Sequence, residues 1–424
     1  MGQRLKFPGN FLWGSATSAH QVEGGNFNDW SKWEHKNADE KASVAEEKNW
    51  PEYILNNYPS PKDRENYISG KACDHYHVFD SDFDLAKNLG QNAHRFSIEW
   101  SRIEPKDGEF DEFEIEHYRK VLLALKTRDI EPFVTLHHFT NPVWFAEKGG
   151  WEQRNAPRYF ARYAERVFQE FGGLVKFWIT INEPTVLFFS GYLSGQWPPR
   201  KKDIFGGIRA FLNLIEAHKN TYQFIKKYSG ETTKVGIAHN IIYFEPYRNK
   251  ILNKVISFFA DYFPNKYLLH KIKDYQDFIG LNYYFHRKIR VSLIQGLWRE
   301  KHKREEATDL DWEIYPRGIY NVLKVLGKYN VPIYITENGL ADAKDEKREN
   351  FITDHLKMIH KAIEEGIDVR GYFHWSLIDN FEWDKGFWPR FGLIEVDYKT
   401  MERKIRPSAM VYAKICKENI INGG

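Results

Sequence analysis

Short apolar runs alternate along the chain with longer segments in which apolar residues recur every three or four positions. Continuous apolar runs are typical of parallel β-strands that are covered on both faces. The sequence contains eight such runs, at 11–17, 93–98, 131–136, 175–182, 233–240, 277–284, 331–338 and 369–377. We therefore expect eight parallel strands.

The segments between these runs have helical periodicity. In 314–329, for example, Ile319, Val322, Leu323 and Leu326 would form one apolar face. Comparable patterns occupy 78–89, 113–127, 157–171, 206–228, 346–365 and 407–419. This alternation predicts an α/β fold, a (β/α)8 TIM barrel that forms a single domain over residues 1–424. A doubly wound open sheet is the alternative, but the chain has neither GxGxxG nor GxxxxGK[S/T], the phosphate loops that such sheets often carry.

Three long stretches lack clear periodicity and are expected to be loops. They are 26–70, which is polar and contains three prolines, 191–204, and 286–311, which is basic. In a barrel, the loops that follow the strands gather at the end that carries the active site. These loops should therefore surround the site.

A further segment, 250–272, is basic and rich in aromatic residues. One helical face would contain Ile251, Val255, Phe258, Phe259 and Tyr262. We expect an outer barrel helix that buries this face against the sheet. The alternative, less expected, is membrane association through an amphipathic helix that lies on the lipid surface.

Composition and charge limit the possible functions. The 424 residues carry a net charge of +3, with basic and acidic residues interspersed, which does not favour a nucleic-acid partner. The two cysteines, Cys73 and Cys416, suggest neither a disulfide framework nor a metal site, so no metal is expected. The first residues resemble no secretion signal and no run is long enough to cross a bilayer, which favours a cytoplasmic protein. Aromatic residues reach 16%, and tyrosine and tryptophan offer the apolar face and polar edge that suit a sugar ring.

Polar or charged residues mark six of the eight predicted strands near their carboxyl ends. They are His94–Arg95, His137–His138, Asn182–Glu183, Asn282–Tyr284, Glu337–Asn338 and His374–Trp375. A carboxylate after a strand often serves only as the N-cap of the next helix. Six such strands are more than capping explains, and in a barrel their ends would meet at one mouth.

Glu183 and Glu337 would face each other across this mouth. A retaining glycosidase needs two carboxyl groups about 5–5.5 Å apart, one that protonates the leaving oxygen and one that attacks the anomeric carbon. Arg95 would keep Glu337 ionised and the Tyr284 hydroxyl would orient it, whereas the charge of Glu337 would raise the pKa of Glu183. Glu183 would start as the acid and, once Glu337 becomes an ester, act as the base that activates water.

The segments TINEP (180–184) and ITENG (335–339) resemble glycoside hydrolase family one, which includes β-glucosidases, β-galactosidases and 6-phospho-β-glycosidases. Further matches follow in order along nearly the whole chain, from FLWGSATSAHQVEGG (11–25) through HRFSIEWSRI (94–103) to HWSLIDNFEWDKGFWPRFGL (374–393). One short match is weak evidence, but so many in the right order leave little room for chance. The resemblance implies a retaining β-glycosidase that acts on small β-glycosides or short oligosaccharides without a cofactor.

The resemblance also implies a role for each matching residue. Glu183 would be the acid/base and Glu337 the nucleophile, in contact with Arg95 and Tyr284, while Asn182 would bind the sugar 2-hydroxyl. Contacts with the rest of the sugar would come from Gln21, His138, Asn282, Glu382 and Trp383, with Trp375 as the platform under the ring, Phe391 as an apolar wall and Trp312 on the leaving-group side.

Differences within the family narrow the expected substrate. In the 6-phospho branch a serine, a lysine and a tyrosine stand where this chain has Glu382, Pro389 and Phe391, and a glutamate would repel a phosphate. We therefore expect neutral glycosides. Phe139 stands where most members have tryptophan, which together with HWSL resembles the archaeal branch and leaves glucosides, galactosides, fucosides and mannosides open.

Two other functions remain open. A transglycosylase would use the same covalent intermediate but transfer the sugar to an acceptor instead of water. A sugar-binding relative would lack turnover, although the presence of both glutamates counts against it. The sequence carries no signal for the oligomeric state.

Overall fold

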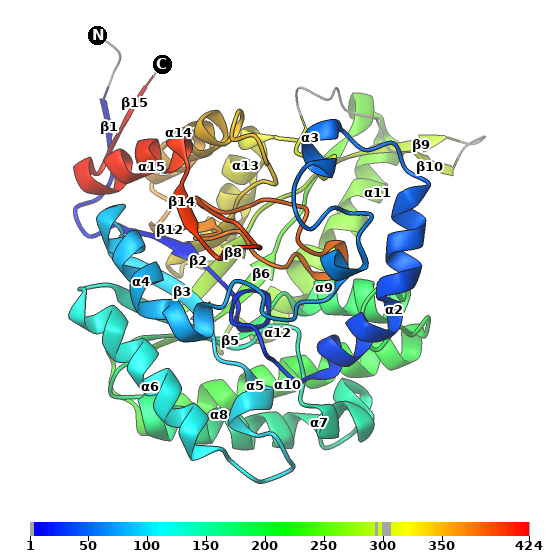
Figure 1. The fold of residues 1–424 in the computed structure, drawn as a ribbon. Coiled ribbons are helices and arrows are strands. Elements are labelled where there is room, and N and C mark those ends of the chain that lie inside the picture. Colours follow the sequence, from blue (N-terminus) through cyan, green and yellow to red (C-terminus); the bar gives the residue numbers. More distant parts are fainter. Residues whose placement is uncertain (1–3, 293–295, 299–306, 424) are drawn as a thin grey trace.

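The computed structural model describes residues 4–292, 296–298 and 307–423. Its centre is a closed barrel of parallel strands with helices around it (Figure 1), which confirms the predicted (β/α)8 fold. The strand order around the barrel is β11, β12, β2, β3, β4, β5, β6, β8. Their bounds are β2 (Leu12–Ala16), β3 (Ala93–Ser97), β4 (Glu131–His137), β5 (Phe177–Asn182), β6 (Lys234–Asn240), β8 (Phe278–Asn282), β11 (Ile333–Asn338) and β12 (Val369–Trp375).

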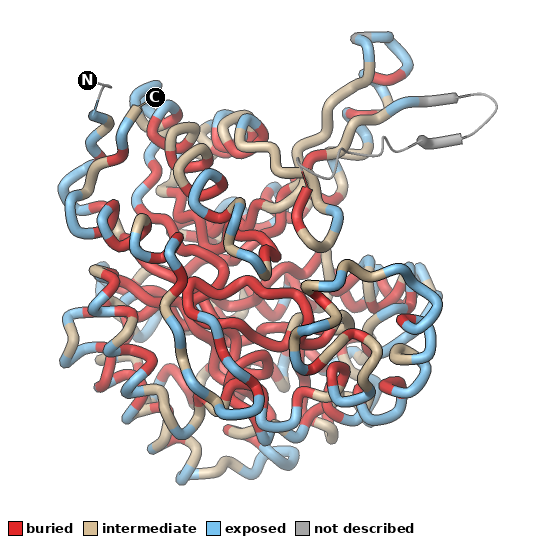
Figure 2. Tube along the Cα trace, turned by 45° about the horizontal axis from the view of Figure 1, so that its top comes forward, coloured by how far each residue is buried: buried red, intermediate tan, exposed pale blue. Residues whose placement is uncertain are grey.

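The barrel strands are buried on both faces, as their apolar sequences predict (Figure 2). Inside the barrel, Phe133 of β4 stacks on Phe177 of β5 with their ring centres 4.1 Å apart. Phe133 also contacts Phe373 of β12 across the interior. Trp178, the next residue on β5, packs outward in the helix layer against Phe168. Alternation along each strand thus fills the interior and the outer layer with different side chains.

The predicted helices are present within a few residues of their expected bounds. The apolar face predicted at 314–329 is buried in α13, including Ile319 and Leu323. The outer helices are α4 (His75–Asn88), α6 (Glu112–Thr127), α8 (Ala156–Phe171), α10 (Ile204–Tyr228), α13 (Pro316–Leu326), α14 (Arg348–Glu364) and α15 (Pro407–Glu418). Shorter segments include α1 (Ala19–Val22), α5 (Trp100–Ile103), α7 (Val143–Glu147), α9 (Pro184–Leu187), η3 (Phe188–Leu193) and η8 (Trp383–Lys385).

Small sheets lie outside the barrel. β1 (Arg4–Lys6) pairs with β15 (Ile420–Asn422), which brings the two ends of the chain together (Figure 1). β13 (Ile394–Val396) pairs with β14 (Arg403–Ile405). β9 (His286–Ser292) pairs with β7 (Tyr243–Pro246) and β10 (Gly296–Trp298), so the stretch predicted as a loop at 286–311 contains two strands. Residues 293–295 and 299–306 of that stretch lie outside the described residues.

The prediction of a loop over 26–70 is wrong for much of its length. The segment contains α2 (Asp29–Glu46), α3 (Glu52–Leu55) and η1 (Arg64–Tyr67). Asn28 begins α2 with a capping box. Its side chain accepts a hydrogen bond from the backbone amide of Ser31, and the Ser31 hydroxyl accepts one from the backbone amide of Asn28. The inner face of α2 mixes Trp30 and Ala38 with polar residues such as Glu34 and Asn37. No continuous apolar stripe therefore identifies the helix in the sequence.

The expectation that 250–272 buries its aromatic face against the barrel is also wrong. This segment forms α11 (Ile251–Asp261), η5 (Tyr262–Tyr267) and α12 (Leu268–Ile272). α12 buries Leu268, Leu269 and Ile272, whereas α11 packs beside β7 and β9 with most of its apolar side chains exposed. None of the helices in the described ranges is both long enough and apolar enough to span a membrane.

Candidate active site

The two predicted catalytic glutamates come from β5 and β11, which have β6 and β8 between them in the barrel. Their side chains lie close enough for the charge of Glu337 to act on Glu183. Glu337 belongs to β11, and Glu183 follows β5 with a left-handed backbone at φ 45°. The parallel register is interrupted between Ile179 and Asn182 on β5, and between Ile335 and Glu337 on β11. Such irregularities re-aim side chains at the end of a strand. Both glutamates therefore turn toward the mouth of the barrel.

Glu337 is held from two sides by donors. Arg95 Nη1 donates to Oε1 at 2.5 Å, and the Tyr284 hydroxyl donates to Oε2 at 2.9 Å. The side chain is buried, with a residue exposure of 4%. Burial raises the pKa of Glu337, whereas the charge and hydrogen bond of Arg95 and the hydrogen bond of Tyr284 lower it. Burial is the larger effect and leaves the pKa of Glu337 raised overall, while these donors oppose it and favour the ionised form.

Glu183 has neutral neighbours. Its Oε1 accepts from Asn282 Nδ2 at 2.7 Å and from Asn240 Nδ2 at 3.3 Å. Burial, followed by the negative charge of Glu337, raises the pKa of Glu183 to about 8. The two carboxyl groups thus share a site but differ in their donors, because Arg95 donates to Glu337 whereas neutral amides donate to Glu183.

Arg95 connects Glu337 to Asn182. It is fully buried and also donates from Nε to Thr135 Oγ1 at 3.1 Å and from Nη2 to Asn182 Oδ1 at 2.7 Å. Asn182 Nδ2 lies 3.1 Å from His138 Nε2. Burial and the charge of Arg95 lower the pKa of His138 well below its usual value, so the ring is neutral. Its buried Nδ1 has no hydrogen-bond partner among the described residues.

The predicted sugar contacts gather around His138. Its ring is parallel to those of Trp375 and Trp383, with centres 6.0 and 5.9 Å away. Gln21 Nε2 donates to Glu382 Oε2 at 3.3 Å, next to Trp383. Burial and the charges of Glu337, Asp384 and Glu183 raise the pKa of Glu382 to about 8.

A second group of aromatic residues lies next to Tyr284, which binds Glu337. The Trp312 ring is 5.7 Å from the Tyr284 ring and 6.0 Å from the Phe391 ring, measured between centres. Phe391 is buried and Trp312 is half-buried. All the predicted site residues therefore belong to one connected group at the mouth of the barrel.

Sequence reasoning missed two contributors to this group. Asn240 is the last residue of β6 and binds Glu183, and Thr336 Oγ1 donates to Asn282 Oδ1 at 2.7 Å. The position of Asn240 at the end of a predicted strand was a usable signal, since it is polar and follows an apolar run. Thr336 carried no such signal because threonine is common inside strands.

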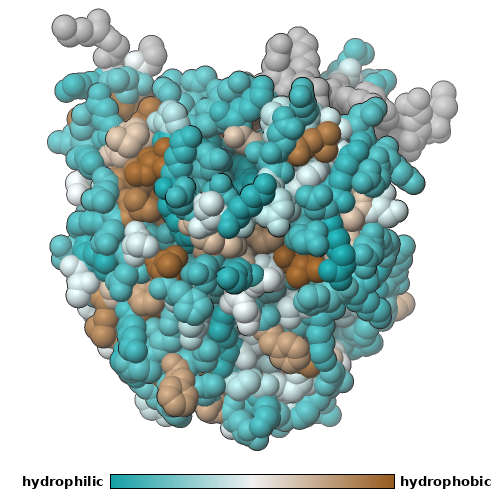
Figure 3. Space-filling view, in the orientation of Figure 1, coloured by the Kyte–Doolittle hydropathy of each residue, from teal (hydrophilic) through white to brown (hydrophobic). Residues whose placement is uncertain are grey.

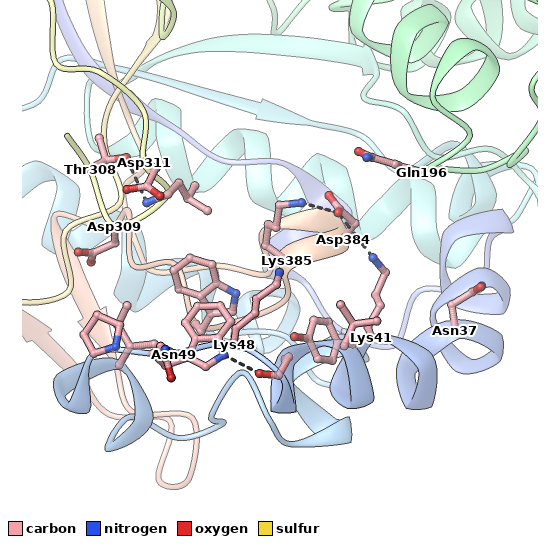
Figure 4. A pocket seen from close by; sticks show the side chains of 18 of the residues that line it. Asn37, Lys41, Lys48, Asn49, Gln196, Thr308, Asp309, Asp311, Asp384 and Lys385 are labelled. Carbon is pink, nitrogen blue, oxygen red and sulfur yellow. Dashed lines mark hydrogen bonds and ion pairs between the residues drawn. The ribbon is translucent and has the colours of Figure 1, made fainter. Parts of the chain in front are cut away.

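A cavity of about 1280 Å³ opens beside Asp384 and Lys385, which follow Trp383 in the sequence (Figure 4). It is lined by α2, by 194–196 and 308–311, and by Asp384 and Lys385, but not by the two glutamates. Asp384 Oδ2 lies 2.6 Å from Lys385 Nζ and 3.6 Å from Lys41 Nζ. Trp33, Trp50 and Trp388 contribute rings to the wall. The cavity is larger than the 300–1,000 Å³ typical of small-molecule sites, so it has room for an extended ligand.

Histidines near the site do not form a metal centre. His137 packs against Trp151, and its Nε2 lies 3.1 Å from Asn141 Oδ1, as expected for a packing histidine. Within the described ranges, no group of three or more histidine, cysteine, aspartate or glutamate residues is arranged to hold a metal ion.

Comparisons with known proteins agree with this geometry. The family model of glycosyl hydrolase family 1 matches residues 3–271 and 262–421. Beta-glucosidase A of Thermotoga maritima is 34% identical, over 98% of this chain and 98% of its own. A 6-phospho-beta-galactosidase of Staphylococcus epidermidis is 32% identical, over 98% of this chain and 99% of its own. The solved structure of a beta-glycosidase from Pyrococcus horikoshii has a TM-score of 0.87 and 39% identity, covering 99% of this chain and 97% of that one. The chain therefore belongs to glycosyl hydrolase family 1 and is a glycoside hydrolase built on a (β/α)8 barrel.

Proposed function

We propose that this enzyme hydrolyses terminal neutral β-glycosides with retention, using Glu337 as the nucleophile and Glu183 as the acid/base. The observation that carries this proposal is the difference between the two carboxyl groups. Glu337 accepts from Arg95 and Tyr284, whereas the pKa of Glu183 is raised to about 8. At neutral pH this arrangement supplies one ionised carboxylate and one protonated carboxyl group, which is the pair that the first step needs.

In the first step, Glu337 attacks the anomeric carbon while Glu183 gives its proton to the glycosidic oxygen. The bond to the leaving group breaks, and the sugar becomes an ester of Glu337. The ester is neutral, so the pKa of Glu183 falls. Glu183 then takes a proton from water, the resulting hydroxide displaces the ester, and both carboxyl groups return to their starting states. Asn182, fixed by Arg95 and His138, is placed to bind the 2-hydroxyl of the sugar.

The charges around Glu382 favour a neutral sugar over a 6-phosphorylated one. The negative charges of Glu337 and Asp384 raise the pKa of Glu382 more than the Lys385 ammonium lowers it, so the charge around Glu382 is negative on balance. A phosphate dianion in that field would be repelled. This argument separates the chain from its 6-phospho-beta-galactosidase relative, and the names of the other two relatives are consistent with a neutral β-glycoside.

Hydrolysis is favoured over sugar binding without turnover because both carboxyl groups and their partners are in place. The large cavity favours a short oligosaccharide or a comparably long aglycone as the leaving group. We also propose a cytoplasmic location. Cys73 and Cys416 are both free and buried, which suits a reducing compartment.

The test is turnover of p-nitrophenyl β-glucoside, β-galactoside, β-fucoside, β-mannoside and 6-phospho-β-glucoside by the wild type and by Glu337→Ala. We expect neutral glycosides to be cleaved by the wild type and not by the variant. Cleavage of the phosphorylated substrate alone would overturn the assignment of Glu382. Adding acceptor sugars and comparing transfer products with free sugar separates hydrolysis from transglycosylation.

A further inference from the structure

The outward face of α11 is apolar, and its inward face is polar. Ile251, Phe258 and Phe259 are 80%, 58% and 68% exposed. The buried residues of the helix are Asn253 and Ser257, and Asn253 Nδ2 donates to the Tyr247 carbonyl at 2.5 Å. This is the reverse of an ordinary surface helix, in which the apolar face packs on the core. Because Asn253 is anchored inside, the apolar face is held toward solvent.

Further exposed apolar residues lie on η3 and α10, which contact η5 through Phe263. Phe263 of η5, which follows α11, has its ring centre 6.4 Å from Phe189 of η3 and 5.7 Å from Phe211 of α10. Phe189 is itself exposed, and so is a row of apolar residues at the start of α10. We call the combined set the apolar rim: Phe189, Ile204, Phe205, Ile208, Leu212, Ile251, Leu252, Val255, Phe258 and Phe259.

The apolar rim borders the mouth of the barrel. η3 follows β5 and Glu183 through α9, and α11 follows β6 through β7, so both lie on the connections that leave the carboxyl ends of strands. α10 begins at the same end. By contrast, the face shown in Figure 3 is mostly hydrophilic, with small and separate hydrophobic patches. An apolar surface of this extent on a protein of this kind marks a binding site.

Positive charge accompanies the part of the rim formed by α11. Residues 248–273 contain six lysine or arginine residues and one acidic residue, Asp261, which pairs with Lys266. Lys250 and Lys254 flank or lie within α11, are exposed, and have no carboxylate partner among the described residues. A second copy of the chain, docked through the same surface about a two-fold axis, would bring these cations together. An anionic surface with an apolar interior complements both the exposed apolar side chains and the exposed lysines of this region.

We propose that the apolar rim docks on an anionic lipid surface, with Phe258, Phe259 and Ile251 inserted among the acyl chains and Lys250 and Lys254 against the phosphates. This is the arrangement of interfacial helices, which combine apolar insertion with electrostatic attraction. The proposal does not depend on which glycoside the enzyme cleaves.

The experiment is flotation of the purified full chain with vesicles of phosphatidylcholine alone and of phosphatidylcholine with phosphatidylglycerol. We expect binding to the anionic vesicles, weakened by salt. The double variants Phe258→Ser/Phe259→Ser and Lys250→Glu/Lys254→Glu should each bind at least about tenfold more weakly. Phe113→Ser is the matched control, because Phe113 is 89% exposed on α6, far along the chain from the rim.

Turnover of a p-nitrophenyl glycoside and the urea midpoint establish that each variant is folded, since none of these residues belongs to the active site. Wild-type protein that stays unbound on anionic vesicles would overturn the proposal. Binding that survives Phe258→Ser/Phe259→Ser would also overturn it. The same holds if sedimentation shows a dimer that this variant dissociates while the wild type fails to bind vesicles.

Discussion

Glu183 and Glu337 are the same residue type in one buried site, and their neighbours make them different. Arg95 and Tyr284 donate to Glu337, whereas two asparagine amides donate to Glu183. Amides stabilise a carboxylate less than a guanidinium does. The proton therefore stays on Glu183, and the negative charge on Glu337 keeps it there.

Removing the acid/base should affect substrates according to their leaving group. For Glu183→Ala, we expect kcat/KM for an alkyl β-glycoside to fall by roughly 10²–10⁴, because a poor leaving group needs the proton. The kcat/KM for 2,4-dinitrophenyl β-glycoside should fall much less. Azide should raise the variant's turnover and give a β-glycosyl azide, detected by NMR. An equal loss for both substrates, with no azide effect, would argue against the role of Glu183.

The raised pKa of Glu183 should set the alkaline limit of activity. The carboxyl group stays protonated through neutral pH and loses its proton as pH rises through about 8, so kcat/KM for an alkyl glycoside should fall there. Glu382 also has its pKa raised to about 8 and could produce the same limb. Glu382→Gln distinguishes the two in a pH–rate profile, since the limb should persist in this variant. Its disappearance would assign the limb to Glu382.

At this scale the sequence predicts which residues belong to the site better than it predicts which of them contact each other. Polar residues after apolar strands identified Glu183, Glu337 and Arg95. Family resemblance supplied the roles of Gln21 and Trp375, which local pattern alone does not indicate. Asn240 was missed although it ends a predicted strand, because a hydrogen bond between neighbouring strands depends on their order and register.

At the scale of elements, a buried charge cluster around Asp379 holds the segment that follows β12 in place. Asp379 is fully buried there and accepts from Arg406 Nη1 and Nη2, both at 2.9 Å, and from the Gly392 amide at 2.9 Å. Arg390 Nη1 lies 3.5 Å from the same carboxylate. This cluster ties the segment carrying Glu382 to the start of α15.

Asp379→Ala should therefore destabilise the fold. It leaves two buried guanidinium groups without their carboxylate, and the expected loss in free energy of unfolding is about 3–5 kcal/mol. Urea denaturation followed by fluorescence measures it. The matched control is Asp368→Ala, because Asp368 is half-exposed, pairs with Arg370 on the surface, and should change stability by under about 0.5 kcal/mol. Similar effects of the two variants would contradict this account of Asp379.

Strands and outer helices were predictable because each buries a periodic apolar face. α2 was not, because its inner face contains Glu34 and Asn37, whose burial is stabilised by hydrogen bonds that only the fold supplies. For α11 the apolar face was recognised, but the prediction that it packs against the barrel was wrong. Its apolar face obeys helical periodicity, but periodicity does not say whether that face meets the core or another surface.

At the scale of the whole molecule, the barrel gathers carboxyl groups at its mouth and α2 helps to enclose a cavity beside them. Trp50 lies in the wall of this cavity, with its ring centre 4.9 Å from that of Trp388. An aromatic ring at this position can stack on a sugar unit of the leaving group.

Trp50→Ala should therefore lower kcat/KM for β-linked oligosaccharides while leaving p-nitrophenyl β-glycosides nearly unchanged. The loss of one ring contact should lower kcat/KM for the oligosaccharide by about tenfold or less. The comparison of the two substrates in one variant is its own control, since misfolding would reduce both. An equal reduction would remove Trp50 from the leaving-group site.

The central claim is that the sugar becomes covalently attached to Glu337. A 2-deoxy-2-fluoro glycosyl fluoride slows the second step and allows the ester to accumulate. Peptide mass spectrometry of the labelled enzyme should place one sugar on the peptide that contains Glu337, and Glu337→Gln should not be labelled. A sugar on another residue, or a product with inverted configuration and no adduct, would contradict the account.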